Sequence, residues 1–206
     1  MPPNNTNDVS ISEYNPGWVT LFQQEAMNIR EHLGHHCLHV FHIGSTSVPG
    51  LVAKPVIDIV VVVRDLNDID CAVDCLQNLN YIDLGEHGIA GRRFFCKSPN
   101  KRQFHVHVFK EGYTDISRHL AFRDYLRQHH PVANAYGAIK QGLADQFTDD
   151  REGYVLGKDS FVRAALYRAG AAKQDQLQAK DHVILESFNP RWGKWAMAEI
   201  QAIKKI

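Results

Sequence analysis

The sequence predicts an α/β protein in which a mixed β-sheet is flanked by helices and followed by a C-terminal helical part. Residues 56–63, VIDIVVVV, form an apolar run too continuous for a strand with one wet face, which indicates a central strand. Residues 104–109, FHVHVF, alternate with a period of two, which is typical of another strand. Apolar residues recur at helical spacing on both sides of these runs.

The composition is that of an ordinary globular protein. A chain of 206 residues can bury a sizeable core, and its length favours one domain with an appendage. Lys and Arg together number 23, as do Asp and Glu, so no overall field attracts long nucleic acid or an anionic membrane. The start of the chain is polar and no apolar run approaches about 20 residues, which predicts a cytoplasmic protein. The 4 cysteines are irregularly spaced, which predicts reduced thiols.

Turn residues and apolar spacing place the remaining elements in order. A helix should run from the Asn15-Pro16 turn to about Leu33, because Gly34 is a natural stop. A proline disfavours the helical conformation of the residue before it, so Pro131 should interrupt the long helical stretch. We further expect strands over residues 40–43, 81–84 and 92–95, a packing helix over about 66–79, helical structure over 116–147, and a helix after residues 149–151.

A small-residue turn and a lone carboxylate mark a candidate site. Asp58 is the only charged residue of the central strand, and an ionised carboxylate among valines and isoleucines needs a cation or several donors. Gly44, Ser45 and Thr46 form a turn whose N–H groups can hold an anion, and Lys54 adds positive charge before the strand. The alternative is a plain turn, with Ser45 or Thr46 as a helix cap and Asp58 held by neighbouring amides.

Three histidines stand out from the 12 in the chain. His42 directly precedes the turn, so we assign it to catalysis together with Asp58 and Lys54. His105 and His107 share one face of their strand about 7 Å apart, where they can share a metal with Asp58 or bind an anionic substrate. The alternative is a pair of polar residues on a wet face of the sheet.

Basic side chains supply candidate substrate contacts. Arg92 and Arg93 are adjacent on a strand, so at most one of them can face the site, and a charged edge strand is the alternative. Arg123 lies on a helix face that mixes basic and apolar side chains. Lys140 is a further candidate for substrate contact, although a surface position on a helix is the default interpretation for it.

The end of the chain echoes its beginning. Residues 183–204 align at one constant offset with residues 9–30. Asn15, Pro16 and Trp18 match Asn189, Pro190 and Trp192 identically. We expect residues 1–170 to form the domain, and residues 171–206 to hold a linker and the start of a second, incomplete repeat. The chain would then be a fragment of a tandem protein or a module with an extra segment. Trp192 and Trp195 should dock on apolar surface, in their own chain or across a homodimer.

Over roughly residues 9–161 the chain resembles the GrpB family, also called family 0157. The resemblance rests on EYNPGW, HIGSTSVPGLVAKPVIDIVV, GIAGRRFF, FHVHVF and RHLAFRDYLRQHH. It implies a nucleotidyltransferase-like fold, in which a Gly-Ser turn holds phosphates and strand carboxylates hold metal. Carried over by position, the implied pocket comprises His42, Ser45, Lys54, Asp58, Arg93, His105, His107 and Arg123.

One position departs from the wider nucleotidyltransferases. Active members usually carry a second carboxylate two residues after the first, where this chain has Val60. The family has no generally established substrate, and the first hypothesis is transfer of a nucleotidyl or phosphoryl group to a small molecule at a divalent ion, Mg²⁺ or Mn²⁺. Ligation by His105 or His107 would favour Mn²⁺ or Zn²⁺, and two histidines with one carboxylate would also permit Fe²⁺. The alternatives are a non-catalytic module that binds a nucleotide or another anion, and a single-metal enzyme that uses Asp58 with the two histidines.

Overall fold

The computed structural model describes residues 10–71, 73–97 and 103–171. These residues fall into two compact units. The described part of the sheet unit comprises residues 15–49, 55–71, 73–97 and 103–120, and that of the helical unit comprises residues 10–14, 50–54 and 121–171. The predicted repeat and its tryptophans lie outside the described residues.

The sheet unit is built on one mixed sheet with the strand order β1-β2-β5-β4-β3. β2 pairs with β5 in parallel, and the other neighbours pair antiparallel. The predicted α/β class, a mixed sheet flanked by helices, is confirmed. The strands are β1 (Cys37–Ile43), β2 (Val56–Val63), β3 (Ile82–Asp83), β4 (Arg92–Lys97) and β5 (Gln103–Lys110).

Burial is deepest in β2, as its continuous apolar run predicts. Ile59, Val60, Val61 and Val63 are all 0% exposed, because β2 has strands on both sides and side chains against both faces. Burying each such side chain contributes roughly 1.5–3 kcal/mol to stability. Asp58 interrupts this run, so whatever surrounds it must offset the cost of placing a carboxylate there.

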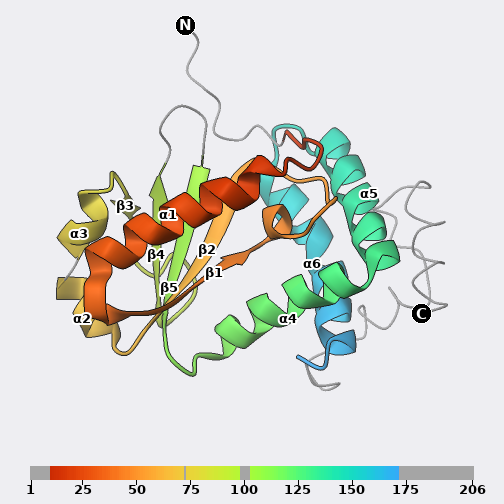
Figure 1. Ribbon diagram of the computed structural model, residues 1–206. Coiled ribbons are helices and arrows are strands. Elements are labelled where there is room, and N and C mark those ends of the chain that lie inside the picture. Colours follow the sequence, from red (N-terminus) through yellow and green to blue (C-terminus); the bar gives the residue numbers. More distant parts are fainter. Residues whose placement is uncertain (1–9, 72, 98–102, 172–206) are drawn as a thin grey trace, which may run out of the picture. The chain divides into compact units, whose positions relative to one another are not determined.

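Helices cover the two faces of the sheet differently. α1 (Gly17–Leu33) lies along one face and ends at Gly34, whose φ of 53° is readily adopted only by glycine (Figure 1). Between β2 and β3 the chain forms two short helices, α2 (Leu66–Cys71) and α3 (Val73–Gln77). On the other face, Ile116 and Leu120 from the start of α4 (Thr114–Gln128) pack against a buried cluster of Ile43, Val60, Val62 and Phe109.

A buried carboxylate joins three distant segments of the sheet unit. Glu25 on α1 is 5% exposed, and its Oε1 accepts hydrogen bonds from the Tyr81 hydroxyl at 2.9 Å and from Lys97 Nζ at 3.0 Å. The Lys97 ammonium also lies 5.3 Å from the centre of the Tyr81 ring. Burial and the neighbouring Glu25 raise the pKa of Tyr81 well above its ordinary value, so its hydroxyl remains a donor.

The helical unit contains the rest of α4, α5 (His130–Gln146) and α6 (Arg151–Arg168). Pro131 lies in the first turn of α5, as predicted, and the Asp150 carboxylate caps α6 by accepting from the N–H of Gly153. A Cβ on Gly157 of α6 would lie 2.5 Å from a methyl of Leu143, so this glycine lets α6 approach α5 closely. Among the described helices, none combines the length and apolar character needed to cross a bilayer.

Candidate active site

Asp58 meets both strand histidines on one face of the sheet. The parallel register of β2 and β5 places Asp58 beside His105 and Val60 beside His107. The Asp58 Oδ1 atom lies 3.3 Å from His105 Nδ1 and 4.0 Å from His107 Nε2. The prediction that both rings share the face of Asp58 is therefore confirmed. Burial alone would raise the pKa of the Asp58 carboxyl, but hydrogen bonds and charge from the two imidazoles outweigh it and lower the pKa.

Arg92 fixes the proton of His107. Its Nη1 lies 3.2 Å from His107 Nδ1, and a guanidinium can only donate. Nδ1 of His107 must therefore accept, so in the neutral ring the proton sits on Nε2, the atom that faces Asp58. His105 instead turns Nδ1 toward Asp58, which leaves its Nε2 for another partner. The two histidines are thus held in different ways around one carboxylate oxygen.

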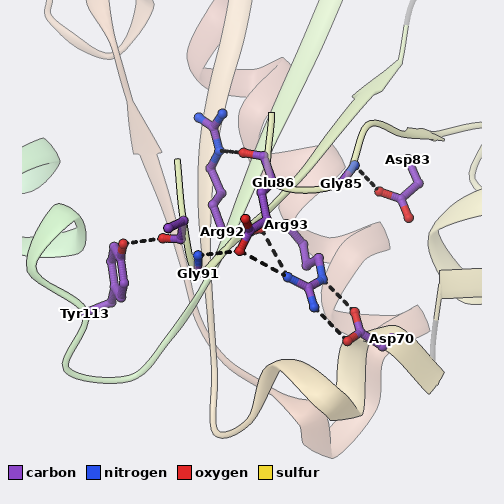
Figure 2. Close-up of polar contacts among 9 residues, drawn as sticks. Asp70, Asp83, Gly85, Glu86, Gly91, Arg92, Arg93 and Tyr113 are labelled. Atoms are coloured by element: carbon purple, nitrogen blue, oxygen red, sulfur yellow. Dashed lines mark hydrogen bonds and ion pairs between the residues drawn. The ribbon is translucent and has the colours of Figure 1, made fainter. Parts of the chain in front are cut away.

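The adjacent arginines serve different partners. Arg92 is 5% exposed and donates from Nε to the Glu86 carbonyl at 3.1 Å, besides its contact with His107. Arg93 makes a bidentate pair with Asp70 on α2, at 2.6 and 2.7 Å (Figure 2). Arg92 therefore lies on the Asp58 face, whereas the family resemblance implied that Arg93 belongs to the pocket. Adjacent strand residues alternate faces, so one step of register reverses the assignment.

The loop that precedes β4 is held by its own polar contacts. The Glu86 carboxylate accepts the N–H of Gly91 at 2.6 Å, and the Tyr113 hydroxyl donates to the Ala90 carbonyl (Figure 2). His87 in this loop has a φ of 43°, and its ring stacks on Phe94 with centroids 4.9 Å apart. Phe94 in turn makes edge contacts with the rings of His105 and His107, so the loop reaches the edge of the site.

The Gly44 turn lies directly against Asp58. Gly44 has a φ of 69°, and a Cβ at this position would lie only 2.4 Å from Asp58 Oδ2. The turn continues as one 3-10 turn over Ser45–Ser47, in which Ser47 and Val48 donate their N–H groups to the Gly44 and Ser45 carbonyls. The first N–H groups of such a turn have no acceptor within it. Ser45 is half-buried, and across residues 10–71, 73–97 and 103–171 its hydroxyl makes no hydrogen bond to the protein.

His42 and Thr46 form a support behind the turn. His42 pairs with Ile59 in the β1–β2 register, so it lies on the face opposite Asp58. It is 6% exposed, stacks on Phe22 of α1 at 4.7 Å, and its Nε2 lies 3.1 Å from the Thr46 hydroxyl. That hydroxyl donates its proton to the Val56 carbonyl at 3.0 Å, so His42 must be the donor to it. The structure gives these two residues an anchoring geometry and does not bring His42 to the carboxylate.

Three other predicted residues lie in the helical unit. Lys54 Nζ lies 4.7 Å from the centre of the Tyr154 ring. Arg123 donates from Nε and Nη2 to the carboxylate of its neighbour Asp124, at 2.7 and 3.1 Å. Lys140 is only 2% exposed, against the expectation of a surface position on a helix. Its burial follows from its place on the inner side of α5, which carries nine buried residues.

His119, on the first turns of α4, completes the histidine cluster and was not identified from the sequence. Its ring lies 5.6 Å from that of His107 and 6.3 Å from that of Phe109. Burial and the neighbouring His107 lower the pKa of His119 to about 4. Its position becomes evident only once α4 is known to pack on the face that Phe109 lines.

The lowered pKa of His119 predicts acid sensitivity. The unfolded chain binds a proton on this residue near pH 6.5, whereas the folded chain resists protonation until about pH 4. Stability is therefore complete above pH 6.5 and falls as the pH is lowered toward 4, by at most about 3 kcal/mol from this group. We expect His119→Phe to flatten the dependence of the unfolding free energy on pH between 6.5 and 4, measured by urea titration. An unchanged slope in this variant would assign the acid sensitivity to other groups.

The donor set does not fit two catalytic metal ions. Such a site needs paired carboxylates, but the next position on the face of Asp58 is Val60, which is 0% exposed. Within the part of the chain that the structure describes, no three His, Cys, Asp or Glu side chains are arranged to hold an ion. Asp58 uses Oδ1 for the two imidazoles, and its Oδ2 faces Gly44. Among the described residues, the position two residues after Asp58 therefore offers Val60 in place of the second carboxylate that a two-ion mechanism needs.

Known proteins resemble this chain in both sequence and fold. The family model described as GrpB protein matches residues 8–168. The UPF0157 protein YqkA of Bacillus subtilis is 38% identical over 85% of this chain and 51% of its own length, so the chain spans about half of that relative. A UPF0157 protein of Halalkalibacterium halodurans is 38% identical over 83% of this chain and 87% of its own length. The crystal structure of the conserved protein GrpB from Enterococcus faecalis is 40% identical, with a TM-score of 0.74 over 78% of this chain and 96% of that one. The chain therefore belongs to the GrpB family.

Proposed function

We propose that the chain transfers a nucleotidyl or phosphoryl group to a small-molecule acceptor, with His105 and Asp58 moving the acceptor proton. The observation that carries the proposal is the direct contact of Asp58 with His105 and His107, on a face that meets the Gly44 turn. A carboxylate that holds an imidazole orients the ring and stabilises its charged form, as in other acid–base pairs. Asp58 supplies this function for His105.

The roles of the residues follow from their hydrogen bonds. His105 presents Nδ1 to Asp58, so its Nε2 is the atom that accepts the proton of an acceptor hydroxyl. The acceptor oxygen then bonds to phosphorus, and the bond from phosphorus to the leaving oxygen breaks with its electron pair. In nucleotidyl transfer the leaving group is pyrophosphate. His107 is held by Arg92 and acts as a positioning residue for Asp58.

The Gly44 turn is suited to hold the phosphates of the donor. The Ser45 hydroxyl and the first N–H groups of the 3-10 turn are hydrogen-bond donors, and short turns of this kind bind phosphate in many proteins. Gly44 lets the backbone lie against Asp58, so a phosphate at the turn would be next to the carboxylate and its histidines. Binding and proton transfer would then occur at neighbouring atoms of one unit.

A second function has its own supporting observation. Val60 is fully buried where active nucleotidyltransferases usually carry a second carboxylate, and this replacement is what a non-catalytic module that binds a nucleotide would show. In that case Asp58 and the histidines bind the ligand without catalysing a reaction. The two candidates share a ligand and differ in whether a product forms.

One experiment separates the two. The full chain is incubated with each of the four ribonucleoside triphosphates and a mixture of amino acids, sugars and polyols, with Mg²⁺, with Mn²⁺ and with EDTA. Release of pyrophosphate, the leaving group of nucleotidyl transfer, and of nucleoside diphosphate, the leaving group of phosphoryl transfer, is measured together with the thermal shift. Turnover that falls at least a hundredfold in His105→Gln, with the thermal shift retained, supports transfer. A thermal shift without turnover supports the binding module, and neither signal with any triphosphate contradicts both.

A further inference from the structure

The helix α1 is held against the sheet by a few buried side chains. Over residues 17–30, the positions with at most 5% exposure are Trp18, Glu25, Ala26 and Ile29. The turn before the helix is closed by Asn15, whose Oδ1 accepts the N–H of Gly17 at 2.8 Å. Positions 19, 20, 23, 24, 27 and 30 are exposed. The helix therefore has a contact face, formed by its buried residues, and an exposed face.

The echo at the end of the chain repeats the contact face of α1 and changes its exposed face. Residues 183–204 lie outside the described residues, but their sequence aligns with α1 and the turn before it. Identical residues stand at the turn and at three of the four buried positions: Asn15 and Asn189, Pro16 and Pro190, Trp18 and Trp192, Glu25 and Glu199, Ile29 and Ile203. None of the six exposed positions is identical in the two copies. The segment 188–203 therefore carries the side chains with which α1 contacts the sheet.

The apolar positions that differ between the copies offset each other in volume. Ala26 corresponds to Ile200, which is larger, whereas Phe22, four residues earlier, corresponds to Ala196, which is smaller. Side chains four residues apart are neighbours on a helix, so the two changes together keep the apolar volume roughly constant. The segment 188–203 therefore suits the same surface as α1 in shape as well as in composition.

The surface under α1 selects a helix with one carboxylate. Glu25 Oε1 accepts from the Tyr81 hydroxyl at 2.9 Å and from Lys97 Nζ at 3.0 Å, and the Lys97 side chain is only 14% accessible. An ammonium buried to this extent is costly without a carboxylate beside it. Glu199 is the only acidic residue of the sequence 188–206, and it stands at the position of Glu25. Charge and apolar pattern thus match the same surface in one register.

We propose that the segment 188–203 binds the sheet surface under α1 in a second copy of this chain, in exchange with the α1 of that copy. Glu199 then takes the place of Glu25 beside Tyr81 and Lys97. Because one set of contacts replaces a nearly equal set, the exchange costs little beyond association, and the dimer depends on concentration. Residues 172–187 can span up to roughly 50 Å when extended, which is enough to reach another copy. The exchange does not depend on chemistry at Asp58.

Two conservative substitutions in the full chain test the competition between the segments. The dimerisation constant is measured by analytical ultracentrifugation over a concentration series, and circular dichroism checks the fold of each variant. Glu25→Gln keeps the size of the side chain but removes its charge, so α1 becomes the weaker partner of Lys97 and dimerisation should strengthen about tenfold or more. Glu199→Gln should weaken dimerisation by a similar factor, and the double variant should return close to the parent chain.

Matched controls change the same residue types away from the contact face. Glu31→Gln alters an exposed glutamate of α1 and should leave dimerisation unchanged. Trp192→Ala should weaken dimerisation, whereas Gln201→Ala, at the position of the exposed Met27, should not. The proposal is overturned if the parent chain and Glu25→Gln are both monomeric throughout their soluble range, or if Glu199→Gln or Trp192→Ala dimerises as well as the parent. An equal effect of Glu31→Gln and Glu25→Gln would also overturn it.

Discussion

Replacing Gly44 by alanine is expected to destabilise the sheet unit by more than about 3 kcal/mol and to abolish any activity of the Asp58 site. Gly44 has a φ of 69° and a ψ of −174°, a backbone region essentially restricted to glycine, so a residue with a side chain pays roughly 1–3 kcal/mol there. The new Cβ would also lie 2.4 Å from Asp58 Oδ2, so either the turn or the carboxylate must move. Urea unfolding followed by circular dichroism measures the loss.

Gly112→Ala is the matched control for this substitution. Gly112 has a φ of 81° in the same unit, but a Cβ there meets nothing within 4 Å. It should therefore show the cost of a positive φ without a steric clash. The double variant Gly44→Ala with Asp58→Ala should recover part of the loss, because the clash with the carboxylate is removed. Equal destabilisation by Gly44→Ala and Gly112→Ala would contradict the close approach of the turn to Asp58.

Asp58→Asn is expected to keep the fold and to lower transfer activity by roughly 10²–10⁴-fold, the range seen when an acid–base pair loses its carboxylate. The amide retains the size of the side chain but cannot accept protons from two imidazoles with the same charge. Triphosphate turnover and the thermal shift are measured in parallel. Retained turnover would remove Asp58 from the mechanism.

Asp58→Asn should also change how the free energy of unfolding depends on pH in acid. The folded pKa of Asp58 is lowered, so its contribution is present above the unfolded pKa of about 4 and is lost as the pH falls below it. In Asp58→Asn this part of the loss should be absent, whereas the loss between pH 6.5 and 4 that arises from His119 should remain. Measuring both variants over the full range separates the two groups.

The sequence predicts well the features that depend on hydrophobic periodicity and composition, such as the positions of strands and the faces of their side chains. The run at Val56–Val63 defined the central strand, and the alternation around His105 and His107 placed both rings on one face. It predicts poorly what depends on register between elements. Nothing in the local pattern of Arg92 and Arg93 says which one faces Asp58, because the answer is set by the pairing of β4 with β5.

Contacts between residues far apart in the sequence explain why His42 and Lys140 lie elsewhere than predicted. His42 precedes the turn in sequence, yet the pairing of β1 with β2 turns it to the face where α1 packs. Lys140 resembles any lysine on a polar helix until α5 is known to bury the side that carries it. The roles predicted for Lys54, Arg123 and a divalent metal stay predictions.

The buried contact of Glu25 with Tyr81 and Lys97 has a consequence for how the sheet unit opens and closes. Tyr81 and Lys97 lie 56 and 72 positions from Glu25, so none of the three residues acquires its final surroundings until long loops have closed. Once formed, the contact couples α1 to the β3–β4 side of the sheet. Amide protons in these segments should therefore exchange with solvent in a single cooperative opening rather than by independent fraying.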